Sequence, residues 1–170
     1  FIHFSTDQVY WGKGIQSEGN GSYGNYYSKC KLLSEEEAKK FKSVILRTNF
    51  FGKSQNRKKL SFSDKIYNSC INNTKIDIFN DVYFSPVSFN TIFNVINILI
   101  KKNLHGIYNL GTKEGMSKKE FALYFCEKVK LDTKNIAGNS IDEVDHIARR
   151  PKDMRLNSEK LENDLGIKLM

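Results

Sequence analysis

Residues 43–52 read SVILRTNFFG, a short apolar run that gives way to the polar residue Asn49 and ends in a glycine. Short apolar runs bounded by polar residues and glycine are typical of buried strands. Residues 1–7 read FIHFSTD and repeat the pattern, with Thr6 among the polar residues that follow the apolar ones. Because open α/β sheets keep their binding sites at the carboxyl ends of the strands, we expect Thr6 and Asn49 to lie at one shared edge of a sheet.

Helical patterns alternate with these strands. Residues 25–41 mix apolar side chains with charges as an amphipathic helix does, and residues 90–101 carry isoleucine, valine and leucine at three- and four-residue spacing. Residues 106–111 form a further strand pattern, and Ser117 with Glu120 makes a capping box before the next helix. This alternation predicts an α/β fold with parallel strands and right-handed crossovers. The remaining elements expected from the residue pattern are helices near 60–71 and 158–165, a strand at 76–79 and an extended segment at 83–89.

Composition and charge restrict the class of protein. A chain of 170 residues with 39% hydrophobic content suits one globular domain and excludes a peptide scaffold, a fibrous repeat and a disordered tail. Its 27 lysines and arginines outnumber 19 acidic residues, giving a net charge of +8, but the cations are spread along the chain and interleaved with acids. We therefore expect no nucleic-acid partner and no membrane partner, although a basic protein of this kind attracts phosphorylated small molecules.

The cysteines and the longest apolar stretch indicate in which cellular compartment the protein is expected. Cys30, Cys70 and Cys126 are odd in number and lack CxxC spacing, so we expect neither a disulfide framework nor a metal site. The apolar stretch 89–100 is interrupted by asparagines and is too short to span a bilayer. These features predict a cytoplasmic protein.

Tyr27 and Lys31 stand four residues apart on an expected helix, so their side chains lie on one face, one turn from each other. A neighbouring ammonium group favours the ionised form of a phenol and makes the tyrosine a usable proton donor or acceptor. A hydroxyl such as that of Thr6 can bind the same substrate oxygen. The spacing alone is also common on helix surfaces, which leaves a plain surface pair as the alternative.

Three motifs occur in a recognisable order: STDQVY at 5–10, NYYSKCKLLSE at 25–35 and ILRTNFFG at 45–52. In order and spacing they resemble the extended short-chain dehydrogenase/reductase superfamily acting on nucleotide sugars. The STD form of the first motif, the LRT strand and ARRP at 148–151 are most similar to its dTDP-4-dehydrorhamnose reductase branch. The resemblance covers nearly the whole chain.

The resemblance implies a narrower fold class, the rear half of a doubly wound, Rossmann-type parallel sheet with a small C-terminal substrate-binding α+β region. Residues 1–53 are then the remainder of the Rossmann-type domain with the catalytic motifs. Residues 54–170 are mostly the substrate-binding region, with the strand at 106–111 returning to the main sheet. No Gly-x-x-Gly-x-x-Gly loop follows any strand pattern, so we expect the C-terminal portion of a longer enzyme that binds NAD(P) only weakly by itself.

The resemblance also implies roles for single residues. Tyr27 matches the family's catalytic tyrosine, and Lys31 matches the lysine that lowers the pKa of that tyrosine and binds the nicotinamide ribose. Thr6 matches the hydroxyl that binds the substrate carbonyl, with Asp7 beside it on the substrate side. Asn49 matches a position near the nicotinamide and the sugar diphosphate, although a strand-end cap is an equally good interpretation.

Arg150 and Asp153 have the Arg-x-x-Asp spacing that contacts the nucleotide in related sugar epimerases. A guanidinium suits a diphosphate, and a carboxylate suits ribose hydroxyls. The alternative is that Arg149 and Arg150 form a solvated basic corner.

The implied activity is reduction of the 4-keto group of a nucleotide-activated 4-keto-6-deoxy sugar, with NADPH or NADH as cofactor. Dehydratases of the superfamily carry a glutamate as base where this chain has Gln8, whose amide cannot act as one, so we expect no dehydration. A 4-epimerase with the same three residues and a non-catalytic sugar-nucleotide-binding subunit remain as alternatives. A homodimer of the full-length protein is left open.

Overall fold

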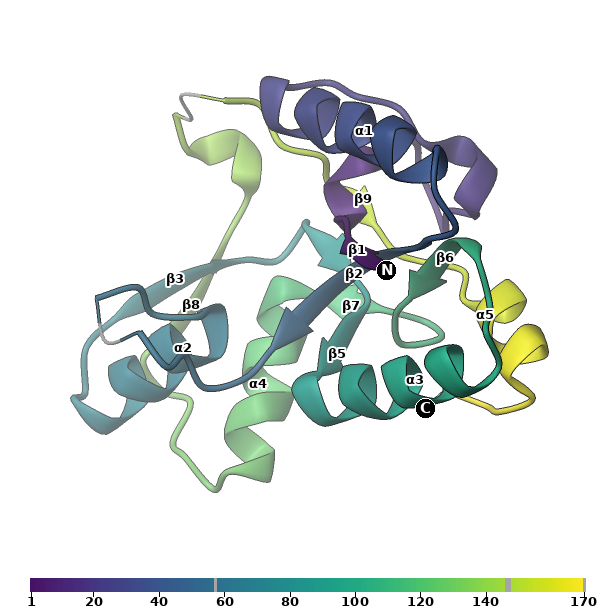
Figure 1. Cartoon of the computed structure of the whole chain (residues 1–170). Helices are drawn as coiled ribbons and strands as arrows, with labels where there is room; N and C mark the ends of the chain where they lie inside the picture. The colour runs from purple at the N-terminus through teal and green to yellow at the C-terminus, as the bar shows by residue number, and fades with distance from the viewer. Residues whose placement is uncertain (57, 146–147, 170) are drawn as a thin grey trace.

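The computed structural model describes residues 1–56, 58–145 and 148–169. The chain forms a parallel sheet covered by helices on both faces, and a second group of short strands and helices lies beside that sheet (Figure 1). This arrangement confirms the α/β class expected from the alternating strand and helix patterns.

The main sheet is centred on β2 (Val44–Phe51), the longest strand. β1 (Ile2–Phe4) and β6 (Gly106–Leu110) pair with the first part of β2 from its two sides, and β5 (Pro86–Ser88) pairs with its last three residues. All three pairings are parallel, as predicted for β1, β2 and β6. The segment that contains β5 was expected only to be extended. The carboxyl ends of β1 and β6 therefore lie along the same edge of the sheet as Thr48 and Asn49 of β2.

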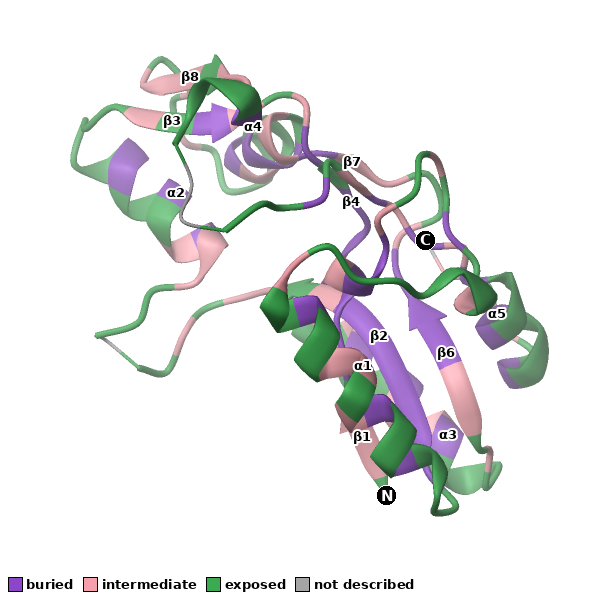
Figure 2. Ribbon diagram, turned by 90° about the horizontal axis from the view of Figure 1, so that it is seen from above, coloured by how far each residue is buried: buried purple, intermediate pink, exposed green. Residues whose placement is uncertain are grey.

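Helices cover the two faces of this sheet (Figure 2). α1 (Tyr26–Lys39) lies on one face and α3 (Phe89–Lys101) on the other, while α5 (Glu159–Leu165) packs beside β6. α5 ends where Gly166 adopts a left-handed conformation, with φ of 69°, which glycine tolerates without a steric penalty.

The face towards α3 is apolar. Val44 and Leu46 of β2 share a buried cluster with Val95 and Leu99 of α3. Tyr108 and Leu110 of β6 and Leu161 of α5 extend the same cluster. The three- and four-residue spacing in α3 thus produces the apolar stripe that holds this helix against the sheet.

The second group of elements has its own apolar core. β3 (Ile76–Phe79) pairs in parallel with β8 (Ile136–Asn139), and β4 (Tyr83–Phe84) lies between two further strands. The remaining elements of this group and of the connections are α2 (Phe62–Ile71), β7 (Met116–Ser117), α4 (Lys118–Lys128), β9 (Asp153–Met154) and the 3₁₀ turns η1 (Asp7–Val9), η2 (Glu18–Asn20) and η3 (Ile141–Glu143).

The predicted capping box is present at the start of α4. The Ser117 side chain accepts from the backbone of Glu120, whose carboxylate accepts from the backbone of Ser117. Among the described residues, no helix is both long and apolar enough to cross a membrane.

Candidate functional site

Thr6, Asp7 and Asn49 meet at the carboxyl edge of the main sheet. Thr6 caps η1, with its hydroxyl accepting a hydrogen bond from the backbone of Gln8 at 3.2 Å. The next side chain, Asp7, is buried and accepts a hydrogen bond from the Asn49 amide at 2.7 Å. Thr6 and Asn49 therefore lie at one edge of the sheet, as the strand pattern predicts.

A partly buried lysine, Lys118 of the second group of elements, lies close enough to this edge to interact with the charge of Asp7. Burial raises the pKa of the Asp7 carboxyl above its usual value, while the Lys118 ammonium group and the Asn49 amide act in the opposite direction. Burial likewise lowers the pKa of Lys118, although the charge of Asp7 opposes that change. The Lys118 ammonium group lies 3.8 Å from the centre of the Phe84 ring, a cation–π contact at the start of α4.

Tyr27 and Lys31 lie on α1, which begins at a cap formed by Asn25. The Asn25 side chain accepts from the backbone of Ser28 at 2.8 Å and fixes the first turn. The Lys31 ammonium group donates to the backbone oxygen of Phe4 at 2.7 Å, at the carboxyl end of β1. Tyr27 is 50% exposed, and among the described residues its hydroxyl has no hydrogen-bond partner. The geometry leaves this phenol accessible to a ligand.

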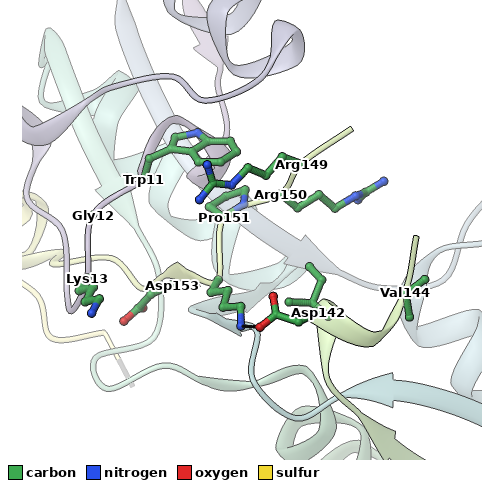
Figure 3. Close-up of a pocket in the computed structure, with 11 residues that line it drawn as sticks. Trp11, Gly12, Lys13, Asp142, Val144, Arg149, Arg150, Pro151 and Asp153 are labelled. Carbon is green, nitrogen blue, oxygen red and sulfur yellow. Dashed lines mark hydrogen bonds and ion pairs between the residues drawn. The ribbon is translucent and has the colours of Figure 1, made fainter. Parts of the chain in front are cut away.

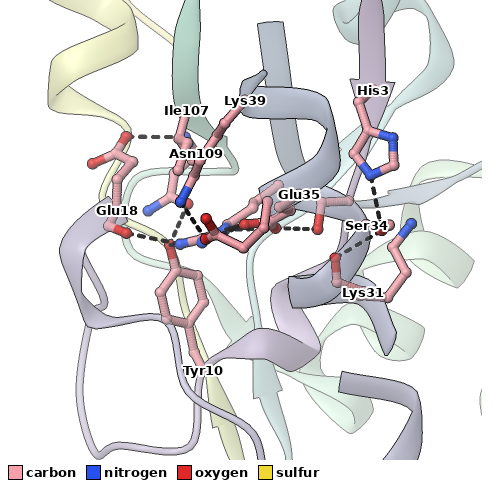
Figure 4. A network of polar contacts seen from close by, with 12 residues as sticks. His3, Tyr10, Glu18, Lys31, Ser34, Glu35, Lys39, Ile107 and Asn109 are labelled. Carbon is pink, nitrogen blue, oxygen red and sulfur yellow. Dashed lines mark hydrogen bonds and ion pairs between the residues drawn. The ribbon is translucent and has the colours of Figure 1, made fainter. Parts of the chain in front are cut away.

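Further along α1, a buried ion pair joins the helix to the sheet (Figure 4). The side chains of Glu35 and Arg47 are 1% and 3% exposed. Arg47 Nε and Nη2 donate to the two carboxylate oxygens at 2.9 and 2.6 Å, and the Ser5 hydroxyl also donates to Glu35. Burial opposes the charge on Arg47, but the hydrogen bonds with Glu35 outweigh it and raise the pKa of the guanidinium.

The same guanidinium extends the network towards β6. Arg47 Nη1 donates to the Tyr10 hydroxyl and to the backbone oxygen of Glu18, each at 2.8 Å. The Tyr10 hydroxyl donates to the Asn109 side chain at 2.7 Å, and the backbone of Asn109 donates to the Glu18 carboxylate at 3.0 Å. One arginine thus connects α1, β2, β6 and the loop that follows β1.

A pocket of about 440 Å³ contains both residues of the Arg-x-x-Asp spacing (Figure 3). Arg150 lines it without an ion pair among the described residues. The Asp153 carboxylate lines it too, but already accepts from the Gly14 backbone at 2.8 Å and from the Arg155 guanidinium at 2.9 and 2.7 Å. Burial acts to raise the pKa of Asp153, but these hydrogen bonds outweigh it and lower the pKa.

Sequence reasoning missed the tryptophan of this pocket. The guanidinium of Arg149 lies over the Trp11 ring at 6.0 Å, and the Asn25 amide donates to the backbone oxygen of Arg149 at 2.9 Å. A Cβ on Gly24 would lie 2.4 Å from the ring, so glycine is required there for the loop to pack on Trp11. The available signal was that Trp11 is the only tryptophan of the chain and directly follows the first motif. Lys13 and Lys152 complete the positive lining.

Comparisons with known proteins identify relatives of the chain. The model of the RmlD substrate binding domain family matches residues 1–170. A dTDP-4-dehydrorhamnose reductase of Escherichia coli is 26% identical over 99% of this chain and 60% of the relative. A probable low-salt glycan biosynthesis reductase, Agl14 of Haloferax volcanii, is 22% identical over 98% of this chain and 58% of the relative.

Solved structures show the same fold. The crystal structure of dTDP-4-dehydrorhamnose reductase from Bacillus anthracis in complex with NADP superposes with a TM-score of 0.88, at 26% identity over 99% of this chain and 60% of that chain. A dTDP-glucose 4,6-dehydratase from Streptomyces venezuelae with NAD bound, at 16% identity over 99% of this chain and 54% of that chain, reaches a TM-score of 0.73 and shares the fold alone. The chain spans about three fifths of the length of the curated relatives that it matches. Since the family model covers every residue, the chain belongs to the RmlD substrate binding domain family.

Proposed function

We propose that this chain carries the catalytic and substrate-binding part of an NAD(P)H-dependent reductase. Its substrate is the 4-keto group of a nucleotide-activated 4-keto-6-deoxy sugar. The observation that carries this proposal is the convergence of three elements at one sheet edge. The Asp7–Asn49 hydrogen bond joins the ends of β1 and β2, and the Lys31–Phe4 hydrogen bond brings α1 to the same place.

The residues at this edge suit the nicotinamide end of a dinucleotide. Lys31 uses one of the three donor hydrogens of its ammonium group on Phe4 and keeps two for ribose hydroxyls. Asn49 uses one amide hydrogen on Asp7 and keeps the other and its carbonyl oxygen. A bound nicotinamide supplies the hydride. Lys31 and Asn49 would hold the nicotinamide end of the cofactor.

The chain's own groups act on the sugar carbonyl. The Thr6 hydroxyl donates to the Asp7 carboxylate at 3.3 Å, and on binding it would turn this hydrogen to the ketone oxygen and hold that oxygen in place. Tyr27 would deliver a proton to the alkoxide that forms at C4, because its hydroxyl is accessible and has no partner among the described residues. The position of Lys31 on the same helical face, one turn later, keeps a positive charge beside this exchange.

The substrate's nucleotide diphosphate suits the pocket of Figure 3. Arg150 offers a guanidinium without an ion-pair partner among the described residues, and Lys13 adds a second cation. The Asp153 carboxylate is already occupied by Arg155 and the Gly14 backbone, so its first role is to hold the loop at Gly14 in place. A direct contact of Asp153 with the ribose stays a prediction.

The test is turnover by the full-length polypeptide that contains this chain. With NADPH and a nucleotide-linked 4-keto-6-deoxy sugar, we expect stoichiometric ketone reduction, and Tyr27→Phe lowers kcat by roughly 10²- to 10⁴-fold. Tyr26→Phe is the matched control, since this neighbouring tyrosine is 81% exposed. Analysis of the product by NMR separates a reduced sugar from an epimer. Near-normal turnover by Tyr27→Phe, or no reduction by the unmodified protein, would contradict the proposal.

A further inference from the structure

The buried pair Glu35–Arg47 is more than the fold needs. Replacing a buried ion pair by apolar residues of similar volume is often neutral or stabilising, because removing two charges from water offsets their attraction. The opposite face of the same sheet shows that apolar side chains suffice, since Leu46 and Leu99 lie together in the buried cluster that holds α3. Burying Glu35 and Arg47 is costly, and apolar side chains could attach α1 to the sheet equally well. A second role for the pair, beyond holding the helix, is therefore expected.

The pair lies close to the helical part of the proposed site. Glu35 follows Lys31 by four residues and Tyr27 by eight, so the three share one face of α1. Its carboxylate accepts a hydrogen bond from Ser5, which directly precedes Thr6. These contacts fix the rotation and the axial position of α1 relative to the end of β1, which is followed by the Thr6 hydroxyl proposed to bind the substrate oxygen.

Arg47 fixes the second half of the arrangement. It lies on β2 two residues before Asn49. Its Nε and Nη2 donate to Glu35, and its Nη1 donates to Tyr10 and Glu18. A guanidinium is a rigid planar fork, so these contacts permit one position of α1 relative to β2. A lysine offers a single nitrogen and cannot reproduce them.

We infer that Glu35 and Arg47 are positioning residues, which set the register of α1 against β1 and β2 so that Tyr27 and Thr6 share one substrate oxygen. The inference rests on the proposed ketone reduction. It assigns to the pair a role in kcat that is separable from its role in folding, because neither side chain is available to contact substrate or cofactor.

The decisive variant is Glu35→Leu combined with Arg47→Met in the full-length polypeptide. The apolar pair preserves burial, so we expect a melting temperature within about 5 °C of the unmodified protein. Because the directional contacts are lost, we expect kcat to fall about 10- to 100-fold with the KM for the nucleotide sugar within about threefold. A kcat within about threefold of the unmodified protein at an unchanged melting temperature would overturn the inference.

Arg47→Lys is the second variant, should the double variant fail to fold. We expect the same selective loss of kcat. Glu162→Gln is the matched control, since this buried glutamate of α5 accepts from the Leu169 backbone at 2.6 Å and pairs with Lys168, and none of its polar contacts within the described part of the chain involves α1. Its kcat stays at the level of the unmodified protein. An equal loss in the control would show that any buried polar change has this effect and would overturn the inference.

Hydrogen exchange without substrate separates this inference from the proposed function. In Arg47→Lys, amides of α1 exchange faster while those of α3 keep their protection, because only α1 loses its directional contacts. Unchanged protection of α1 would overturn the inference whether or not the protein reduces a ketone. If the unmodified protein shows no reduction but α1 is selectively loosened, the proposed function fails while the register role of the pair stands.

Discussion

The two faces of the main sheet hold their helices by different means. Towards α3 the contact is apolar, with Leu46 and Leu99 in one buried cluster. Towards α1 it contains a buried ion pair, Glu35–Arg47, with hydrogen bonds that continue to Asn109 (Figure 4). Apolar attraction is non-directional, whereas hydrogen bonds to a guanidinium fix angles as well as distances. The face with directional contacts is the one that carries the residues of the proposed site.

The largest effect is expected when one member of the ion pair is removed alone. Arg47→Met leaves the Glu35 carboxylate buried without its cation, so we expect the free energy of unfolding to fall by about 3–5 kcal/mol. Urea unfolding followed by circular dichroism measures this loss. Adding Glu35→Leu should recover most of it, and a double variant as unstable as the single one would show that the α1 face is not equivalent to an apolar contact.

On the α3 face, truncating a buried side chain should lower the free energy of unfolding by the same amount or less. Changing the shape of that side chain at constant volume should lower it only slightly. Leu99→Ala removes a side chain that is fully buried in the apolar cluster, so we expect a loss of about 2–5 kcal/mol. Leu99→Met keeps the volume and should cost less than about 1.5 kcal/mol. The same unfolding experiment decides, and a large loss for Leu99→Met would mean that this face also depends on exact geometry.

A smaller effect with the opposite sign is expected at Asp7. Burial raises the pKa of this carboxyl, so the folded state favours the protonated form and the contribution of Asp7 to stability falls as the pH rises through that raised pKa. Asp7→Asn removes the buried charge and keeps an acceptor for Asn49. We expect the melting temperature at pH 7 to rise by about 2–4 °C.

The pH dependence provides the check on Asp7. Below the ordinary carboxyl value of 3.8, Asp7 is protonated in both the folded and the unfolded state, and the gain from Asp7→Asn should disappear. Calorimetry at both pH values tests this. A gain that is the same at both would exclude the buried charge as its cause.

The smallest effect is expected for the exposed ion pairs of α1. Lys39 pairs with Glu36 one turn earlier, and both side chains are largely in water. Lys39→Ala should change the free energy of unfolding by less than about 0.5 kcal/mol. A larger loss of unfolding free energy at low ionic strength would show that charges on the outer surface of α1 also stabilise the helix. The α1 and α3 faces would then differ less than the buried contacts suggest.

The contrast between Glu35 and Glu36 shows where sequence reasoning stops. Both belong to the charged run EEEAKK at 35–40, which looks like a solvated helix face, yet Glu35 is buried and Glu36 is exposed. The periodicity of α1 is too weak to separate them, whereas the apolar stripe of α3 is clear in the sequence. The partner of Glu35 lies twelve residues away on β2, and no local pattern specifies that contact.

The same limit applies to the strands and the pocket. β1, β2, β6 and α1 to α5 were predicted, because each has a run of apolar or amphipathic residues. The segment that contains β5 was expected only to be extended. β7, β9 and β8 were missed, since the first two have two residues each and β8 contains Gly138 instead of an apolar alternation. The pocket combines Trp11 with Ile141, Asp142, Val144 and residues 149–153, and this proximity follows from tertiary structure alone.

Transfer of deuterium tests the central claim most directly. The full-length polypeptide is incubated with a nucleotide-linked 4-keto-6-deoxy sugar and NADPH that carries deuterium at the transferable position, and the product is examined by mass spectrometry and NMR. If Thr6 and Tyr27 act on the carbonyl oxygen while hydride reaches the carbon, the product carries one deuterium at C4, and Tyr27→Phe forms the same product more slowly. A product without deuterium at C4, or with C4 hydrogen taken from solvent, would contradict reduction at this site.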